Sequence, residues 1–134
     1  MKYLLDTNII SALVSEPHGP VAQRALERGQ ERLCTSIVVV CELWFGVIQK
    51  RSARLEHSLR SVLGVLPVVQ LEAGVELHSA EIRARLERKG SPLGSVDLFI
   101  AAHARSLGAV LVTRNERAFR RVPGLDVENW YRSG

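Results

Sequence analysis

The chain has 134 residues, of which 46% are hydrophobic and 24% charged, and its formal net charge is +4. This composition is typical of a globular protein and argues against a disordered chain, and the length favours one domain over residues 1–134. No segment approaches the roughly 18 apolar residues of a membrane span, so we expect a cytoplasmic protein, and the positive charge favours an anionic partner such as nucleic acid.

The chain begins with a strand, two helices and a second strand. Residues 2–5 are short and apolar, which favours a strand, and a short helix over 9–14 stops near Pro17. A helix over 19–30 has Pro20 where a first turn tolerates it. Its apolar residues recur at helical spacing: Val21, Ala25 and Leu26. Residues 32–35 are predicted to be a strand.

Residues 37–50 have two interpretations. The β-branched run at 37–40 favours a strand by propensity. The length of the segment and the following ELWFGVIQK favour a helix with Ser36 as N-cap. We predict a strand ending near Ser36 and a buried helix after it. An amphipathic helix over 52–64 follows, with one apolar face made by Leu55, Leu59, Val62 and Leu63.

The rest of the chain continues the alternation. In order, we predict a strand over 66–71, a helix over 72–90, a loop over 91–94, a helix over 95–108 capped by Ser95, a strand over 109–113, a helical turn around 115–120 and a strand near 125–128. Strands separated by helices imply an α/β fold with a parallel sheet covered on both faces. Sites in such sheets lie beyond the carboxyl ends of the strands.

Three acidic residues have apolar neighbours: Asp6 after LL, Glu42 in VVVCELWF and Asp97 in SVDLFIAA. Asp6 either caps the next helix or is held there for chemistry. Asp97 lies in the first turn of its helix, where the macrodipole favours an anion. Glu42 lies inside its helix, where no cap role exists, and a buried Glu must become neutral or meet a cation.

A divalent metal ion would account for all three acids together. Carboxylates converging at strand ends make an oxygen-lined site suited to Mg²⁺ or Mn²⁺. Such an ion can activate water and stabilise charge on a phosphoryl group. Candidates for orienting the carboxylates are Thr7, Asn8 and Thr113, with an ordinary helix start as the alternative for the first two.

Basic residues follow the strand over 109–113, namely Arg114, Arg117, Arg120 and Arg121. Arginines beside an acidic metal site suit a phosphodiester substrate such as RNA, and solubilising surface charge is the alternative for each. The cysteines Cys34 and Cys41 match no common zinc spacing, so we expect two reduced thiols in the core. The four histidines are scattered and offer no alternative metal chemistry.

With these residues identified, the sequence resembles the PIN-domain family and, more narrowly, the VapC-type toxins of bacterial toxin–antitoxin pairs. The resemblance rests on four blocks in this order: YLLDTNII, SIVVVCELWFG, GSVDLFIAAHARSLGAVLVTRN and RVPGLDVENW. It implies an α/β/α sandwich with a parallel sheet of about five strands. It also implies Mg²⁺- or Mn²⁺-dependent cleavage of structured RNA (tRNA or rRNA), a homodimer, and a cognate VapB-type antitoxin that reaches into the active site.

The resemblance assigns Asp6, Glu42 and Asp97 to the family's acidic positions. Asp6 and Asp97 would hold the ion, and Glu42 would bind it or orient the attacking water. Family members often have a fourth acid after the last core strand, where this chain has Asn115 followed by Glu116, so the fourth ligand is open between these two. A catalytically weak PIN fold that only binds RNA or protein is the alternative, which the three core acids disfavour.

Overall fold

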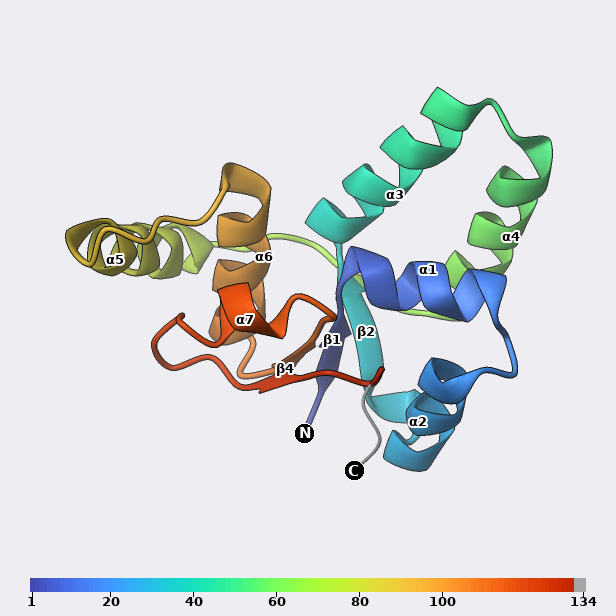
Figure 1. Cartoon of the computed structure of the whole chain (residues 1–134), viewed down its shortest axis with the longest axis horizontal. Coiled ribbons are helices and arrows are strands. Elements are labelled where there is room, and N and C mark those ends of the chain that lie inside the picture. Colours follow the sequence, from blue (N-terminus) through green and yellow to red (C-terminus); the bar gives the residue numbers. More distant parts are fainter. Residues whose placement is uncertain (132–134) are drawn as a thin grey trace.

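Five parallel strands form the centre of the computed structural model, which describes residues 1–131 (Figure 1). They are β1 (Tyr3–Leu5), β2 (Leu33–Ser36), β3 (Val68–Val69), β4 (Val110–Val112) and β5 (Val127–Glu128). Their order across the sheet is β3-β2-β1-β4-β5. The three central strands are buried along their whole length, as expected for parallel strands covered on both faces. The predicted α/β fold with a five-stranded parallel sheet is therefore confirmed.

Seven α-helices connect the strands within residues 1–131: α1 (Thr7–Ser15), α2 (Pro20–Arg28), α3 (Ile37–Lys50), α4 (Ala53–Leu63), α5 (Val75–Arg88), α6 (Ser95–Ser106) and α7 (Glu116–Phe119). A 3-10 turn, Gln30–Arg32, precedes β2. Helices α1, α2 and α4 lie on one side of the strands and α5, α6 and α7 on the other (Figure 1). Helix α3 extends beyond the carboxyl end of β2 and contacts both α1 and α6.

The position of β1 in the middle of the sheet places the site. Its neighbours are β2 on one side and β4 on the other, with Tyr3 aligned to both Leu33 and Val110. The chain leaves β1 through α1 and returns to β4 from α6, which lie on opposite sides of the sheet (Figure 1). A crevice at the carboxyl ends of the strands is the usual result of such a switch in direction.

Three predicted element boundaries were wrong. The strand predicted over 66–71 is only Val68–Val69, at the edge of the sheet. The carbonyl of the preceding Pro67 accepts the N–H of Thr35 (2.9 Å), but a proline has no N–H to donate in return. The helix predicted from residue 72 begins at Val75, because Gly74 has a left-handed backbone (φ 112°). Ser95 is the first residue of α6, and the N-cap is Gly94, with no side-chain cap bond.

Several apolar side chains expected in the core lie at the surface. Leu26 is exposed on α2 although Val21 and Ala25 are buried as predicted. Cys34 is a buried thiol, whereas Cys41 is exposed on α3, so the prediction for Cys41 was wrong. The spacing of apolar residues identifies the apolar face of a helix. It does not tell how much of that face other elements of the fold will bury.

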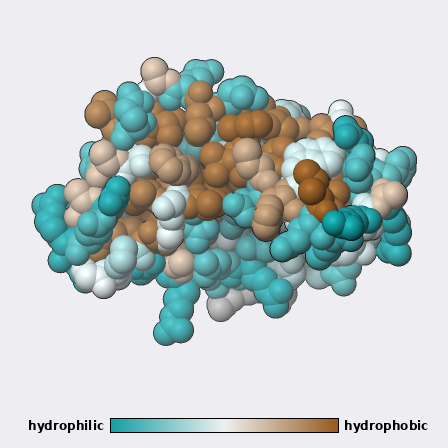
Figure 2. Space-filling view, turned by 90° about the horizontal axis from the view of Figure 1, so that it is seen from above, coloured by the Kyte–Doolittle hydropathy of each residue, from teal (hydrophilic) through white to brown (hydrophobic). Residues whose placement is uncertain are grey.

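An apolar surface lies on the side of the molecule beyond the strand ends (Figure 2). The exposed large apolar side chains of the chain include Phe45 and Ile48 of α3, which are 63% and 70% exposed, and Val96 and Phe99 of α6. Exposed apolar groups gathered on one face commonly mark an interaction surface. Within residues 1–131, none of the helices has the length and apolar character needed to cross a membrane.

Candidate active site

Asp6 lies directly after β1 and uses its two carboxylate oxygens differently. Oδ1 accepts the N–H of Thr7 (2.8 Å), which makes Asp6 the N-cap of α1. Oδ2 accepts the hydroxyl of Thr113, at the end of β4 (2.7 Å). The residue is 5% exposed. The sequence left a cap and a site residue as alternatives, and the geometry allows both because one carboxylate serves two neighbours.

Glu42 and Asp97 approach the same place from two other helices. Ser36 caps α3 as predicted, its Oγ accepting the N–H of Val38 (3.1 Å), and Glu42 lies inside that helix. Asp97 lies in the first turn of α6. Both side chains are half-buried, so the expected burial of Glu42 was overestimated. Partial exposure to water lowers the cost of the Glu42 charge.

One pocket of about 410 Å³ collects the predicted residues from four separate parts of the chain. Its lining consists of Asp6, Thr7, Asn8, Glu42, Gly94, Ser95, Val96, Asp97, Ile100 and Asn115. The structure thus brings together residues 6, 42 and 97, which are remote in sequence. Sequence reasoning did not identify Gly94, Val96 or Ile100, because nothing in their local pattern separates a pocket wall from a loop or a helix core.

Negative charge accumulates in this pocket. The pKa of Asp97 is raised, first by burial and then by the charges of Asp6 and Glu42, which shows that the three acids interact. Among the ion pairs of residues 1–131, none includes any of these three carboxylates. Their repulsion is therefore not relieved by an arginine or lysine of the described chain, and a bound cation would relieve it.

The donor set suits a hydrated divalent ion better than a closed protein cage. Within residues 1–131, no three His, Cys, Asp or Glu side chains are gathered closely enough to hold a metal ion by themselves. Mg²⁺ commonly keeps several waters and binds through one or two carboxylates plus phosphate oxygens. A pocket of three carboxylates and one amide fits that mode, with the remaining positions left to water and substrate.

A hydrogen-bond network orders the rim on the β4 side. Asn115 N–H donates to Oγ1 of Thr113 (3.0 Å), and Arg114 N–H donates to Oδ1 of Asn8 (2.9 Å). The hydroxyl of Tyr131 donates to the carbonyl of Asn8 (3.1 Å), and the Arg114 guanidinium lies 4.7 Å from the centre of the Tyr131 ring. Tyr131 was not predicted as a site residue, because only the fold brings it to residue 8.

The alternative between Asn115 and Glu116 is clearer in the structure. Asn115 lines the pocket, whereas Glu116 is not among the lining residues and its carboxylate accepts from the Arg120 guanidinium (3.0 Å). Arg121 donates to the carbonyls of Ala118 and Ser91. Of the predicted basic residues, Arg114 lies next to the pocket, and Arg117 is exposed on α7.

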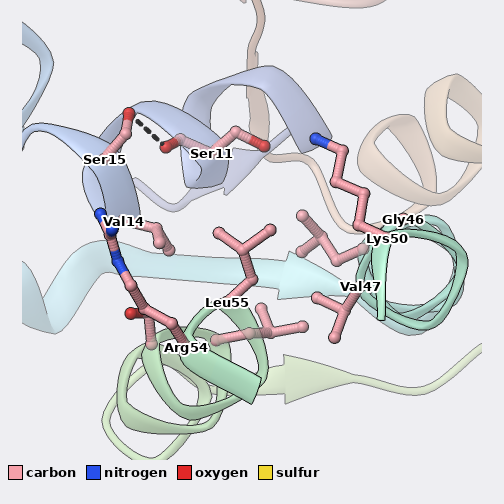
Figure 3. Close-up of a pocket in the computed structure, with 11 residues that line it drawn as sticks. Ser11, Val14, Ser15, Gly46, Val47, Lys50, Arg54 and Leu55 are labelled. Atoms are coloured by element: carbon pink, nitrogen blue, oxygen red, sulfur yellow. Dashed lines mark hydrogen bonds between the residues drawn. The ribbon is translucent and has the colours of Figure 1, made fainter. Parts of the chain in front are cut away.

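A second pocket of about 340 Å³ lies between α1, α3 and α4, apart from the carboxylates. Figure 3 shows Val14, Val47 and Leu55 in its middle and the charged ends of Lys50 and Arg54 on opposite sides. Its floor is apolar and its charged lining residues are basic. This pocket therefore suits an apolar segment that carries acidic groups.

Comparison with known proteins gives consistent matches over the whole chain. The PIN domain family model matches residues 3–125. The tRNA(fMet)-specific endonuclease VapC of Shigella flexneri is 37% identical over 133 residues, covering 97% of this chain and 98% of its own length. Ribonuclease VapC2 of Rickettsia felis is 35% identical over 132 residues, with the same coverage.

Solved structures agree with these matches. VapBC2 from Rickettsia felis, bound to a DNA fragment from its promoter, superposes with a TM-score of 0.85 at 33% identity, covering 97% of this chain and 99% of that one. DNA-bound VapBC from Salmonella typhimurium gives a TM-score of 0.83 at 35% identity, with 97% and 98% coverage.

Proposed function

This chain belongs to the PIN-domain family, and we propose from that premise that it is a metal-dependent endoribonuclease toxin of the VapC type. The observation that supports the proposal most directly is the meeting of Asp6, Glu42 and Asp97 in one pocket. Three interacting carboxylates without a basic partner in residues 1–131 are costly unless they bind a cation. Relatives of similar length are named as ribonucleases.

The pocket residues have separate roles in this proposal. Asp6 and Asp97 hold Mg²⁺ or Mn²⁺, with the Asn115 amide oxygen as a further ligand. When bound, the ion supplies positive charge at the phosphoryl group and makes water more acidic. Glu42 binds the ion or orients the attacking water, and its half-exposed position leaves room for that water. Thr113 orients Asp6 through its hydroxyl.

The neighbouring surface supplies contacts for the RNA backbone. Arg114 is exposed beside the pocket and supported by the ring of Tyr131, so its guanidinium can reach a phosphate with little loss of side-chain freedom. Arg117 and Arg120 on α7 extend the basic surface, although Arg120 already pairs with Glu116. Asn8 ties this rim to α1 by accepting from Arg114 N–H.

Structured RNA of the translation machinery is the proposed substrate, with tRNA ahead of rRNA. The relatives from Shigella flexneri and Salmonella typhimurium, 37% and 35% identical, are both named as tRNA(fMet)-specific endonucleases. A cytoplasmic location follows from such a substrate. Sequencing the 5′ ends of cellular RNA after brief expression would identify the cut, and ends confined to mRNA would contradict the tRNA assignment.

A VapB-type antitoxin is the proposed protein partner, since structural neighbours are VapBC complexes. The pocket in Figure 3 suits one of its segments, because an apolar floor flanked by Lys50 and Arg54 complements an apolar stretch with acidic residues. Replacing both basic residues by glutamate should weaken the complex with a cognate VapB-type antitoxin. Unchanged affinity would remove this pocket from the interface.

A homodimer is the second proposed assembly. Helix α3 exposes the large apolar side chains of Phe45 and Ile48, and α6 exposes those of Val96 and Phe99. A second copy covering these residues would bring two active sites close together, because α6 also carries Asp97. Sedimentation of the Phe45→Glu variant should show a monomer, and an unchanged dimer would place the interface elsewhere.

Cleavage by purified protein tests the activity itself. The wild-type chain should cut total tRNA with Mg²⁺ or Mn²⁺ and stop on addition of EDTA. Asp6→Asn and Asp97→Asn should each lower the rate by about 100-fold or more, since each removes a ligand charge from the ion. Ser52→Ala, which removes the cap of α4 far from the pocket, is the control for altered stability.

The competing function is a PIN fold that binds RNA or protein without cutting. The lack of a ready-made three-ligand group in residues 1–131 is the observation in its favour. It predicts RNA binding with no Mg²⁺-dependent products at any protein concentration. Activity that persists in one of the purified Asp→Asn variants would reject the metal-binding role of the residue replaced in it.

A further inference from the structure

His103 is a buried ionisable residue that has no role in the proposed mechanism. It lies on α6 and is 1% exposed. Its Nδ1 is 2.6 Å from Oγ of Ser36, which is completely buried. Its Nε2 is the buried side-chain nitrogen of residues 1–131 that lacks a hydrogen-bond partner. Burying a polar ring with one unpartnered nitrogen is unfavourable, and the other nitrogen contacts the Ser36 hydroxyl.

The partners of Ser36 determine the tautomer of the ring. The Ser36 Oγ already accepts the N–H of Val38 as the cap of α3. A hydroxyl has one proton to donate, and donating it to Nδ1 of His103 leaves the ring's own proton on Nε2, where the Gln70 carbonyl acts on it. Burial lowers the pKa of His103, which keeps the ring neutral and Nδ1 able to accept.

The other side of the ring faces the segment after β3. The carbonyl of Gln70 and the charge of Glu72 both act on His103, raising its pKa against the effect of burial. A pocket of about 200 Å³ opens there, lined by Gln70, Glu72, His78 and His103 among others. Nε2 itself has almost no solvent-accessible surface, so the Gln70 carbonyl is the group that acts on its proton.

This hydrogen bond joins the two helices that carry the half-buried acids. Ser36 ends β2 and caps α3, which bears Glu42, and His103 lies on α6, which bears Asp97. Glu42 and Asp97 line the same pocket, so the relative position of α3 and α6 sets the distance between the two carboxylates. The short, buried contact between Ser36 and His103 resists separation of these two helices.

We propose that His103 is a positioning residue, which through Ser36 holds the start of α3 against α6 and so fixes the spacing of Glu42 and Asp97. The consequence for catalysis rests on the proposed function, because the spacing matters when the acids share a cation. The effect on the helices does not depend on RNA cleavage. His103 is not a catalytic residue, since it does not line the carboxylate pocket.

Two amide substitutions separate this role from simple packing. In His103→Asn the side-chain amide lies where Nδ1 was, so it can accept from the Ser36 hydroxyl. In His103→Gln the amide lies where Nε2 was and cannot replace that bond. Both bury a neutral amide, so both should lose thermal stability, whereas the Ser36 link survives in His103→Asn alone.

The measurement is the affinity of the full chain for Mn²⁺ in the absence of RNA. The EPR signal of free Mn²⁺ reports how much of the ion is bound. The affinity for Mn²⁺ should fall about 10- to 100-fold in His103→Gln, which is the usual effect of losing a group that orients a metal ligand. In His103→Asn it should stay near the wild-type value. Val21→Ala on α2 is the control, since it removes buried volume away from the acids and should leave Mn²⁺ affinity unchanged.

The outcomes are distinct. If both amide variants bind Mn²⁺ as the wild type does, or both lose it equally, His103 is a packing residue and the inference is overturned. If the wild type itself binds no Mn²⁺, or Asp97→Asn binds it equally well, the proposed metal site is wrong and the inference falls with it. Tight Mn²⁺ binding with a His103→Gln defect but no RNA cleavage would support the inference and reject only the nuclease assignment.

Discussion

The carboxylate of Asp6 gives one oxygen to the α1 N-terminus and the other to the Thr113 hydroxyl. Substitution can therefore separate its part in folding from its part in the site. Asparagine is about as good an N-cap as aspartate, so Asp6→Asn should stay within about 1 kcal/mol of the wild-type free energy of unfolding in metal-free buffer. Asp6→Ala should lose about 1 kcal/mol more, because the cap is gone.

Urea denaturation of both variants at one pH checks this difference. Neither variant should cut RNA, so activity cannot distinguish them and stability must. Equal destabilisation of Asp6→Asn and Asp6→Ala would mean that the negative charge, and not the cap, is what α1 requires at residue 6.

Asp97 should make stability depend on pH in the opposite direction from a paired carboxylate. Its folded pKa is raised above the ordinary value of 3.8, first by burial and then by Asp6 and Glu42. The folded state therefore binds the proton more tightly than the unfolded state. Stability is highest when Asp97 is protonated and falls as pH rises from about the unfolded pKa through the folded pKa.

Removal of this charge should stabilise the metal-free protein at neutral pH. We expect Asp97→Asn to gain about 0.5–2 kcal/mol, toward the lower end because Asp97 is half-exposed and water screens its charge. The gain should shrink as pH is lowered toward the unfolded pKa of the carboxyl. Thermal melts across that range measure it, and a gain that grows on acidification would contradict the assigned direction.

At the scale of elements, local signals predicted most of the helices and their order. Ser36 caps α3 as predicted, whereas Ser52, predicted as the first residue of its helix, is the N-cap of α4. The alternation of short apolar strands with helices predicted the parallel sheet. What could not be predicted depends on neighbours. The half-burial of Glu42 and the exposure of Cys41 depend on which elements pack against α3, and β3 lies at the edge of the sheet.

Two glycines in different elements should respond oppositely to the same substitution. Gly46 lies within α3, and a Cβ there meets no atom within 4 Å, so Gly46→Ala should stabilise the protein by about 0.5–1 kcal/mol. Gly90 follows α5 with φ of +71°, also in open space, so Gly90→Ala should cost about 1–2 kcal/mol from backbone conformation alone.

Chemical denaturation of the two alanine variants tests these signs, and Gly90→Asn supplies a control. Asparagine tolerates the left-handed region better than alanine, so it should recover part of the loss. Two losses of similar size would show that Gly46 is required for a reason other than helix propensity, and its place in the wall of the pocket in Figure 3 would then be the first one to test.

At the scale of the molecule, the strand order creates the site. Residues 6, 42 and 97 were chosen from the sequence because each acid lies among apolar neighbours, a local signal. Their meeting depends on β1 lying between β2 and β4, which a linear pattern does not give. The same holds for Tyr131, which comes from the end of the described chain to support Arg114 beside the pocket.

The net charge of +4 is modest, so where the positive charge lies should matter more for RNA binding than its total. In the inactive Asp6→Asn background, Arg114→Ala should make the slope of log affinity against log salt concentration shallower by about 0.7–0.9, because one phosphate contact is lost. Arg88→Ala on α5 removes the same charge but lies away from the pocket lining. Its slope should stay close to that of the background protein.

Binding of a tRNA transcript, measured at four or more salt concentrations, gives these slopes. Arg114→Lys should keep the slope, since the charge remains, but bind more weakly at every salt concentration because a lysine lacks the planar group that lies over Tyr131. An Arg88→Ala slope as shallow as that of Arg114→Ala would mean that RNA responds to the overall charge of the molecule. The path of the RNA backbone past Arg114 would then have to be abandoned, because no local contact would be needed to explain binding.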